Sequence, residues 1–393
     1  MRPLQPTLFD GDRMSLADAI EITANSLRAY GERYRHWAIA FSGGKDSSAT
    51  LTVVVYLIVS GRIPRPQSLT ILYADTRMEL PPLHATAMTL LAEVRALGID
   101  TRVVLPEMDD RFFVYMLGRG VPPPSNTFRW CTAQIKIEPM LAALKELRDQ
   151  AGEKFLMLTG VRLGESEVRD ARIALSCGKN GAECGQGWFQ EATPEAVADT
   201  LAPILHWRVC LVWDWLIESS LTDEWGIRFS TRLVAECYGG DEAVEINART
   251  GCVGCNLASR DVALERVLEY PHWSYLSPLM ELRPLYAEMK LPKNRLRKDG
   301  TEKRQDGSLV ANPCRMGPLT LEARTGFLER VLDIQRRARI DLINPEEESR
   351  IRELIAAETW PRGWAGDEPI ASLPFDNVNP DGSVQPILRG ILT

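Results

Sequence analysis

The stretch from residue 38 to residue 51, AIAFSGGKDSSATL, decides the fold because it joins an apolar strand to a helix through Ser42-Gly43-Gly44-Lys45-Asp46-Ser47-Ser48. Two glycines let the backbone turn tightly and come close to a ligand. The first amides of the following helix have no partner within that helix, and together with the helix dipole they attract anions. Serine hydroxyls and the Lys45 charge strengthen this attraction. The stretch therefore predicts a loop that binds the phosphates of a nucleotide.

Short apolar runs alternate with helical patterns around this loop. We expect strands at 36–41, 68–75, 101–106 and 154–162, and helices at 14–34 (N-cap Ser15), from the loop to about 60, at 81–97 (opened by two prolines), 111–117 and 135–150. The alternation predicts an α/β fold, a mostly parallel sheet with helices on both faces. Ligands of such sheets bind beyond the carboxyl ends of the strands. The glycine loop, Asp75-Thr76 and the segment after Thr159 fall there.

The pattern changes in the second half of the chain. We expect a loop at 176–187, a basic, turn-rich stretch at 285–310, a helix at about 320–340 and a weakly structured tail from about 361. These changes suggest four parts: an N-terminal helix (1–35), a nucleotide-binding α/β domain (36–235), a region with a cysteine pair, basic residues and a helix (236–345), and a C-terminal tail (346–393). The basic stretch could contact DNA phosphates or be a solvated charged loop.

Composition excludes several classes of protein. The 393 residues carry a net charge of −7, which excludes a wholly basic nucleic-acid coat but not a local basic patch. The first residues lack the apolar core of a signal peptide, and no apolar run is long enough to span a membrane. We therefore expect a cytoplasmic protein without a membrane partner.

The order S-G-G-K-D-S is not a Walker A loop, which needs a glycine five residues before the Gly-Lys pair. It resembles the pyrophosphate (PP) loop of the ATP-pyrophosphatase superfamily, which has the adenine nucleotide alpha hydrolase-like fold. The resemblance implies that ATP, with Mg²⁺, is cleaved between its α and β phosphates. It implies nucleotide contacts from six residues of the loop, namely Ser42, Gly43, Gly44, Asp46, Ser47 and Ser48.

Three further segments are similar to the phosphoadenylyl-sulfate reductase family: FRWCTAQIKIEPM (128–140), LTGVRLGESEVRDAR (158–172) and PILHWRVCLVWDWL (203–216). The second segment implies nucleotide contacts from Gly160, Arg162, Glu165 and Arg169. The reductases use a cysteine near the C-terminus as nucleophile, but no cysteine follows Cys314 here. The nearer likeness is to the ATP-pyrophosphatase component of bacterial DNA phosphorothioation systems (the DndC and SspD type).

For the chemistry we expect Lys45 and Arg162 to stabilise charge on the α-phosphate and the departing pyrophosphate. Asp46 would orient the loop or hold Mg²⁺ with Asp75; alternatively it is only a carboxylate favoured by the helix dipole. Asp75 and Thr76 would contact the ribose or adenine, or else form an ordinary turn at the end of a strand.

The cysteines predict a second site. Cys252 and Cys255 form a C-x-x-C pair, a spacing shared by zinc sites, redox disulfides and iron–sulfur clusters. Four thiolates would complete a zinc site or a [4Fe–4S] cluster. The resemblance favours the cluster and implies Cys131 as third ligand. For the fourth we expect Cys237, with Cys314 as the alternative; Cys177 and Cys184 have no assigned role.

The resemblance implies an ATP-dependent sulfurtransferase-type enzyme that adenylates the DNA backbone phosphate for sulfur insertion. Its partners would be DNA, a cysteine desulfurase as sulfur donor, and the other proteins of a phosphorothioation system. The alternatives are an assimilatory reductase, a tRNA thiolation enzyme, and a non-catalytic nucleotide-sensing iron–sulfur subunit.

Overall fold

The structure is a computed structural model that describes residues 14–165, 167–176, 182–183, 187–192, 196–221, 228–238, 252–300, 312 and 314–372. The chain forms two compact units. Unit 1 comprises Met1–Asp75, Leu80–Val104 and Pro139–Thr250, and unit 2 comprises Thr76–Glu79, Leu105–Glu138 and Gly251–Thr393. The units interleave along the chain, and the sequential four-part division stays a prediction.

Unit 1 is built on a seven-stranded sheet with the order β3-β2-β1-β4-β7-β6-β5. Its strands are β1 (His36–Phe41), β2 (Ser68–Ala74), β3 (Asp100–Val104), β4 (Phe155–Leu158), β5 (Ala182–Glu183), β6 (Trp188–Gln190) and β7 (Ala198–Ala202). The pairs from β3 to β7 are parallel, and β6 and β5 are added antiparallel. The predicted α/β fold with a mostly parallel sheet is therefore confirmed.

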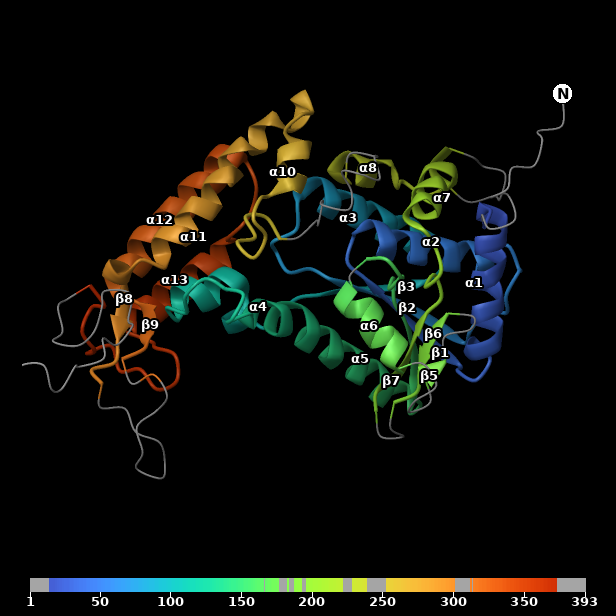
Figure 1. Cartoon of the computed structure of the whole chain (residues 1–393), viewed down its shortest axis with the longest axis horizontal. Helices are drawn as coiled ribbons and strands as arrows, with labels where there is room; N and C mark the ends of the chain where they lie inside the picture. Colours follow the sequence, from blue (N-terminus) through green and yellow to red (C-terminus); the bar gives the residue numbers. More distant parts are fainter. Residues whose placement is uncertain are drawn as a thin grey trace, which may run out of the picture. The chain divides into compact units, whose positions relative to one another are not determined.

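The helices of unit 1 cover both faces of this sheet (Figure 1). They are α1 (Leu16–Gly31), α2 (Lys45–Val59), α3 (Pro81–Ala96), α5 (Glu138–Ala151), α6 (Glu167–Ser176), α7 (Val209–Leu221) and α8 (Arg232–Tyr238). Local sequence explains where two of them begin. Ser15 caps α1 in a reciprocal capping box with Asp18, and α3 opens with prolines in its first turn, where a missing N–H costs nothing.

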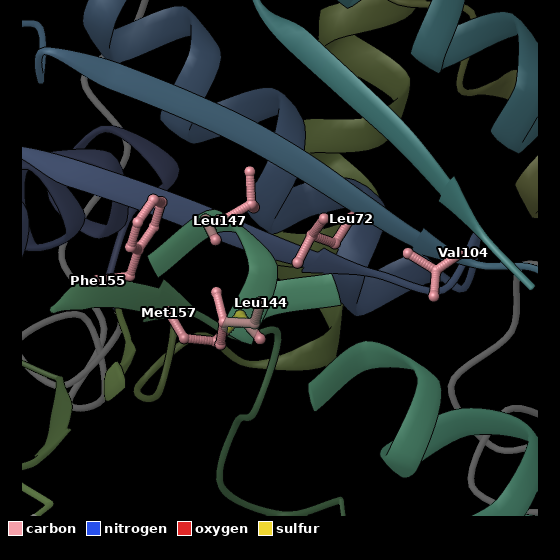
Figure 2. Close-up of a cluster of buried hydrophobic side chains, with 7 residues drawn as sticks. Leu72, Val104, Leu144, Leu147, Phe155 and Met157 are labelled. Carbon is pink, nitrogen blue, oxygen red and sulfur yellow. The ribbon is translucent and has the colours of Figure 1, made fainter. Parts of the chain in front are cut away.

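One half of the core lies between α5 and the sheet. Leu144 and Leu147 of α5 point at Leu72, Phe155 and Met157 on the strands, as Figure 2 shows. Successive strand residues face opposite sides of a sheet, so the intervening residues of β1, Trp37, Ile39 and Phe41, are buried on the other face. The sheet is thus buried on both faces, as expected for parallel strands.

Unit 2 is mainly helical. Its longer helices are η4 (Pro271–Glu281), α11 (Leu282–Met289), α12 (Leu321–Ala338) and α13 (Pro345–Ala356), and α11 lies beside α12 (Figure 1). Its shorter elements are η1 (Met108–Asp110), the π-helical turns η2 (Val114–Gly118) and η3 (Ala133–Ile137), α4 (Trp130–Thr132), α10 (Val262–Val267), η5 (Pro292–Asn294) and the antiparallel pair β8 (Arg295–Arg297) and β9 (Met316–Leu319). Arg324 is fully buried in this unit and donates to the carbonyl oxygens of Leu117 and Thr359.

Several sequence-based expectations need correction. The strand expected at 154–162 ends at Leu158, because the backbone at Gly160 turns to pack against α2. The short helix expected at 111–117 is largely π-helical, and part of the loop expected at 176–187 forms β5. Helix α13 was not expected. Within the described residues, no helix combines the length and the apolar character needed to cross a membrane.

Candidate nucleotide site and cysteine site

The glycine loop, residues 42–48, lies where the strand order of unit 1 reverses. Strand β1 has β2 on one side and β4 on the other, so the chain leaves β1 toward one edge of the sheet and later returns on the opposite side. Such a switch point opens a crevice beyond the carboxyl ends of the strands. The glycine loop follows β1, and the segment with Gly160 and Arg162 follows β4. The topology therefore brings two predicted site segments to the same place.

The backbone of the loop has the form expected of an anion site. Gly43 has a φ of +75°, a conformation that side chains rarely adopt. Gly44 is the N-cap of α2, and no side chain caps this helix end. The first turn of α2 therefore receives no side-chain acceptor from its cap, which leaves this end of the helix suited to an external anion.

The three predicted serine ligands differ in their environments. Ser42 is exposed. The Ser47 hydroxyl donates to the Gly44 carbonyl oxygen at 2.9 Å and accepts from the Ser42 amide at 3.3 Å, so this side chain holds the loop in shape. Ser48 is fully buried, and its hydroxyl has no hydrogen-bond partner among the described residues.

The predicted catalytic residues form one charged group. Asp46 lies between two cations: its Oδ1 is 2.5 Å from Nε of Arg162, and its Oδ2 is 3.1 Å from Nζ of Lys45. All three side chains are largely buried. Nζ of Lys45 also lies 4.9 Å from the ring centroid of Tyr238 on α8, within range of a cation–π interaction. A carboxylate with two cations at the start of a helix is an arrangement that a polyphosphate could enter by replacing the carboxylate as their counter-charge.

Gly160 fixes how closely the second segment approaches the loop. A Cβ atom on this residue would lie 2.8 Å from the Ser47 nitrogen and 2.9 Å from the carbonyl carbon of Asp46. Glu165 is exposed, whereas Ser166 and the Arg169 side chain lie outside the described residues. Asp75 is buried at the end of β2, where its amide donates to the Val104 carbonyl oxygen.

Asp46 and Asp75 do not form a preassembled Mg²⁺ site. Both carboxylate oxygens of Asp46 are engaged by cations. Among the residues that the structure describes, no three His, Cys, Asp or Glu side chains are grouped to hold a metal ion. In many phosphate-binding proteins Mg²⁺ is held by substrate phosphates and only one or two carboxylates, so a preassembled site is not required. Asp46 and Asp75 as its ligands stay a prediction.

Thr76 has contacts near the cysteines, and its predicted contact with ribose or adenine stays a prediction. This residue lies in unit 2, where its hydroxyl donates to Glu79 at 2.6 Å and lies 4.0 Å from the sulfur of Cys252. It thus lines the second predicted site, formed by Cys131, Cys252 and Cys255, which we call the cysteine site.

The C-x-x-C turn of the cysteine site is held in place on every side. The Val253 amide donates to Met78, the Gly254 amide to Asp261, and Arg283 donates to the Cys255 carbonyl oxygen at 2.9 Å. Gly254 has a φ of +66°, and a Cβ atom there would lie 2.7 Å from Cβ of Leu282. Only glycine fits this turn without strain.

The thiols share one electrostatic environment. Burial raises the pKa of Cys252 to about 11. Burial also raises the pKa of Cys131, and the charge of Cys255 adds to this effect. The charge of Cys252 in turn raises the pKa of Lys136, against the opposite effect of burial. The charge of Lys136 can therefore balance negative charge on the sulfurs.

Thiols are donors that structural zinc ions and iron–sulfur clusters share, so the residues of the cysteine site fit either group. Within the described part of the chain, no three His, Cys, Asp or Glu side chains are grouped to hold a metal ion, and the cluster stays a prediction. The side chain of Cys237, the expected fourth ligand, lies outside the described residues, as do Cys177 and Cys184. Cys314 is buried in unit 2.

The basic stretch has structural roles where it is described. Arg297 is fully buried, Arg295 donates to the Gly317 carbonyl oxygen at 2.8 Å, and Lys298 pairs with Glu368 at 2.5 Å. Lys303 and Arg304 lie outside the described residues. These three residues make contacts within unit 2, and contact between the basic stretch and DNA stays a prediction.

Residues 36–223 match the family model of the phosphoadenosine phosphosulfate reductase domain. This stretch, which contains the whole glycine loop and the segment after β4, makes up just under half of the chain and is similar to that domain. No curated protein matches the chain.

Solved structures that are similar at low identity include the following three. A phosphoadenylyl-sulfate reductase from Candida auris in a phosphate complex is 12% identical, and the match covers 56% of this chain and 92% of that one with a TM-score of 0.34. An FMN adenylyltransferase from Candida glabrata with FMN and an ATP analogue is 13% identical, and the match covers 80% of this chain and 82% of that one with a TM-score of 0.36. The U34-tRNA thiolase of Methanococcus maripaludis with its [4Fe–4S] cluster is 13% identical, and the match covers 73% of this chain and 86% of that one with a TM-score of 0.35. Likenesses with such TM-scores do not bear on the substrate of this chain.

Sequence reasoning missed three residues of these sites. Lys136 and Tyr286 lie beside the cysteines, and Tyr238 lies beside Lys45. Lys136 could have been found from the sequence, because it lies five residues after Cys131 in the segment 128–140. The two tyrosines come from distant parts of the chain and carry no local signal.

Proposed function

We propose that the protein is an ATP pyrophosphatase that adenylates a DNA backbone phosphate so that sulfur can replace one of its non-bridging oxygens. The observation that carries the nucleotide half of this proposal is the placement of Lys45, Asp46 and Arg162 at the sheet's switch point. The sequence likeness to DNA phosphorothioation proteins supports the DNA half.

In the proposed reaction, the triphosphate takes over Lys45 and Arg162 from Asp46. A non-bridging oxygen of the DNA phosphate attacks the α-phosphorus, and the bond to the β-phosphate oxygen breaks. Negative charge grows on the departing pyrophosphate, and preorganised cations with helix amides stabilise it without reorganising solvent. The product is an anhydride between the DNA phosphate and AMP.

The adenylated phosphate makes AMP a good leaving group. A persulfide sulfur supplied by a cysteine desulfurase attacks the DNA phosphorus and AMP departs. A second thiol then cleaves the remaining S–S bond, which releases the phosphorothioate and leaves a disulfide on the thiol side.

Cys131, Cys252 and Cys255, with Cys237 or Cys314 as fourth ligand, would hold a [4Fe–4S] cluster. When bound, such a cluster supplies electron transfer or sulfide chemistry. The chain's own contribution is clearer: the clamped turn orients two thiolates, and Lys136 balances their charge.

The test uses anaerobically purified protein, α-labelled ATP and DNA, with the partner proteins added in a second arm. We expect labelled AMP and, in the second arm, phosphorothioate linkages in nuclease digests of the DNA. Lys45→Met should lower AMP formation by about 100-fold or more, the loss typical of a removed charge-stabilising group.

ADP as the sole product would contradict the proposed pyrophosphatase activity. Thionucleosides in tRNA, or sulfite from a sulfonucleotide, would redirect the substrate assignment, and ATP binding without turnover would indicate a sensor.

A further inference from the structure

Tyr286 on α11 packs directly against the C-x-x-C turn of the cysteine site. A Cβ atom on Gly254 would lie 3.5 Å from Cε2 of the Tyr286 ring. On another side the ring meets Phe112, with the two centroids 6.1 Å apart. The side chain is only 1% exposed, so its hydroxyl cannot be satisfied by bulk water.

The Tyr286 hydroxyl has no hydrogen-bond partner among the described residues. A buried polar group without a partner costs about 1–3 kcal/mol, and such groups usually mark a ligand, ion or water that completes the site. An otherwise equivalent phenylalanine would avoid this cost. The hydroxyl is therefore best explained by something that binds at the cysteine site.

The edge of the ring that carries the hydroxyl is the edge that meets the turn. Cε2 is bonded to the carbon that bears the hydroxyl, and it is the Tyr286 atom nearest to the Cβ position of Gly254, which lies between Cys252 and Cys255 in the chain. A tyrosine hydroxyl can donate a hydrogen bond, so a group held by these two cysteines would have a buried donor beside it.

We propose that Tyr286 is a positioning residue whose hydroxyl donates a hydrogen bond to a sulfur of the group held by Cys252 and Cys255, either a cysteine sulfur or an inorganic sulfide. The inference rests on the cluster proposed above. Hydrogen bonds to the sulfurs stabilise the more negative, reduced state and so raise the reduction potential. Tyr286 would thus tune the potential of the cluster and fix the orientation of the C-x-x-C turn.

The test compares wild-type protein, Tyr286→Phe, and a control, Tyr275→Phe, whose partly exposed ring lies on η4. Iron and sulfide are assayed first, and the midpoint potential is then measured by an anaerobic redox titration followed by electron paramagnetic resonance. We expect full loading in all three proteins and a midpoint potential that is more negative in Tyr286→Phe alone.

A second variant covers the case in which Tyr286→Phe fails to load. Replacement of Tyr286 by 3-fluorotyrosine keeps the ring and the hydroxyl but makes the hydroxyl a stronger donor, so the potential should become more positive. Unchanged potentials in the loaded variants would overturn the role of Tyr286 while leaving the cluster in place. Wild-type protein without iron and sulfide would overturn the cluster and this inference, whereas AMP formation would still test the nucleotide site.

Discussion

Nε of Arg162 lies 2.5 Å from Oδ1 of Asp46, although the two residues are 116 positions apart in the chain. The contact joins the segment after β4 to the first turn of α2. Because Lys45 uses the other carboxylate oxygen, Asp46 is a counter-charge that the two cations share.

The first prediction concerns this charge group. Asp46→Asn removes a carboxylate that pairs with the largely buried Lys45 and Arg162, so the free energy of unfolding should fall by about 3 kcal/mol. Pyrophosphate should restore more stability to the variant than it adds to the wild type, because it supplies the missing negative charge and binds only the folded state. Thermal melts at increasing pyrophosphate concentration measure both effects.

Asp199→Asn is the matched control. Asp199 is a buried carboxylate of unit 1 that pairs with Lys154 at 2.6 Å, on β7 and away from the glycine loop. This variant should also lose stability, but pyrophosphate should shift its melting temperature no more than it shifts that of the wild type. Equal pyrophosphate shifts in the wild type and both variants would contradict an anion site at Asp46.

The second prediction concerns the close approach at Gly160. In Gly160→Ala the new methyl group meets backbone atoms of Asp46 and Ser47 at 2.8–2.9 Å, and backbone cannot move aside cheaply. The segment carrying Arg162 should shift away from the loop, and a displacement of about 1 Å can lower turnover by about 100-fold. AMP formation under saturating ATP measures the effect.

Gly326→Ala controls for the substitution itself. Nothing lies within 4 Å of a Cβ atom at Gly326, inside α12, so alanine should raise helix stability by up to about 1 kcal/mol and leave AMP formation unchanged. A Gly160→Ala variant as active as Gly326→Ala would show that the second segment need not touch the loop.

The sequence was informative where structure depends on neighbouring residues. The glycine loop, the Ser15 cap and the prolines of α3 each determine the conformation of residues only a few positions away, and the sequence placed each of them correctly. The antiparallel extension of the sheet was missed because β5 and β6 are too short for an alternating pattern. The π-helical turn at Val114–Gly118 differs from an α-helix only in hydrogen-bond register, which periodicity does not resolve.

In the candidate sites, too, features that depend on neighbouring residues could be predicted, and features that depend on the fold could not. The roles expected of Lys45 and Asp46 follow from the motif, but the pairing of Asp46 with Arg162 depends on β4 lying beside β1. Thr76 was expected at the nucleotide because it follows a strand, and only the fold shows it beside Cys252. Tyr286 contacts a turn 32 residues earlier in the chain, so no local pattern could reveal it.

The third prediction concerns the Lys298–Glu368 pair of unit 2. Burial by itself would raise the pKa of Glu368, but hydrogen bonds from Lys298 and from the Gly366 and Ala365 amides outweigh it and lower the pKa. A lowered folded-state pKa stabilises the protein above the unfolded-state pKa of about 4.3, and this contribution is lost as the pH falls through the folded-state value.

Glu368→Gln should therefore lower the free energy of unfolding at neutral pH, and its difference from the wild type should shrink as the pH falls below about 4. Urea titrations across this range measure the difference. Glu329→Gln, which removes a more exposed partner of Arg352, should have little effect at any pH. A Glu368→Gln difference that stays constant with pH would contradict the ion pair.

The last prediction concerns Gly254 in the C-x-x-C turn. Gly254→Ala combines an unfavourable φ of +66° with a contact of 2.7 Å to Cβ of Leu282, so the turn must move and carry its two sulfurs with it. We expect a loss of iron and sulfide from anaerobically purified protein together with a lower free energy of unfolding.

Gly363→Ala separates the effect of the backbone conformation from the effect of the close contact, because Gly363 has a φ of +86° but only an Arg315 side-chain atom at 4.0 Å. That control should show a stability loss of about 1 kcal/mol from the backbone conformation while it retains the metal. Equal iron content in the two variants would mean that the position of the turn does not determine metal binding, and the assignment of Cys252 and Cys255 as ligands would then lose its structural support.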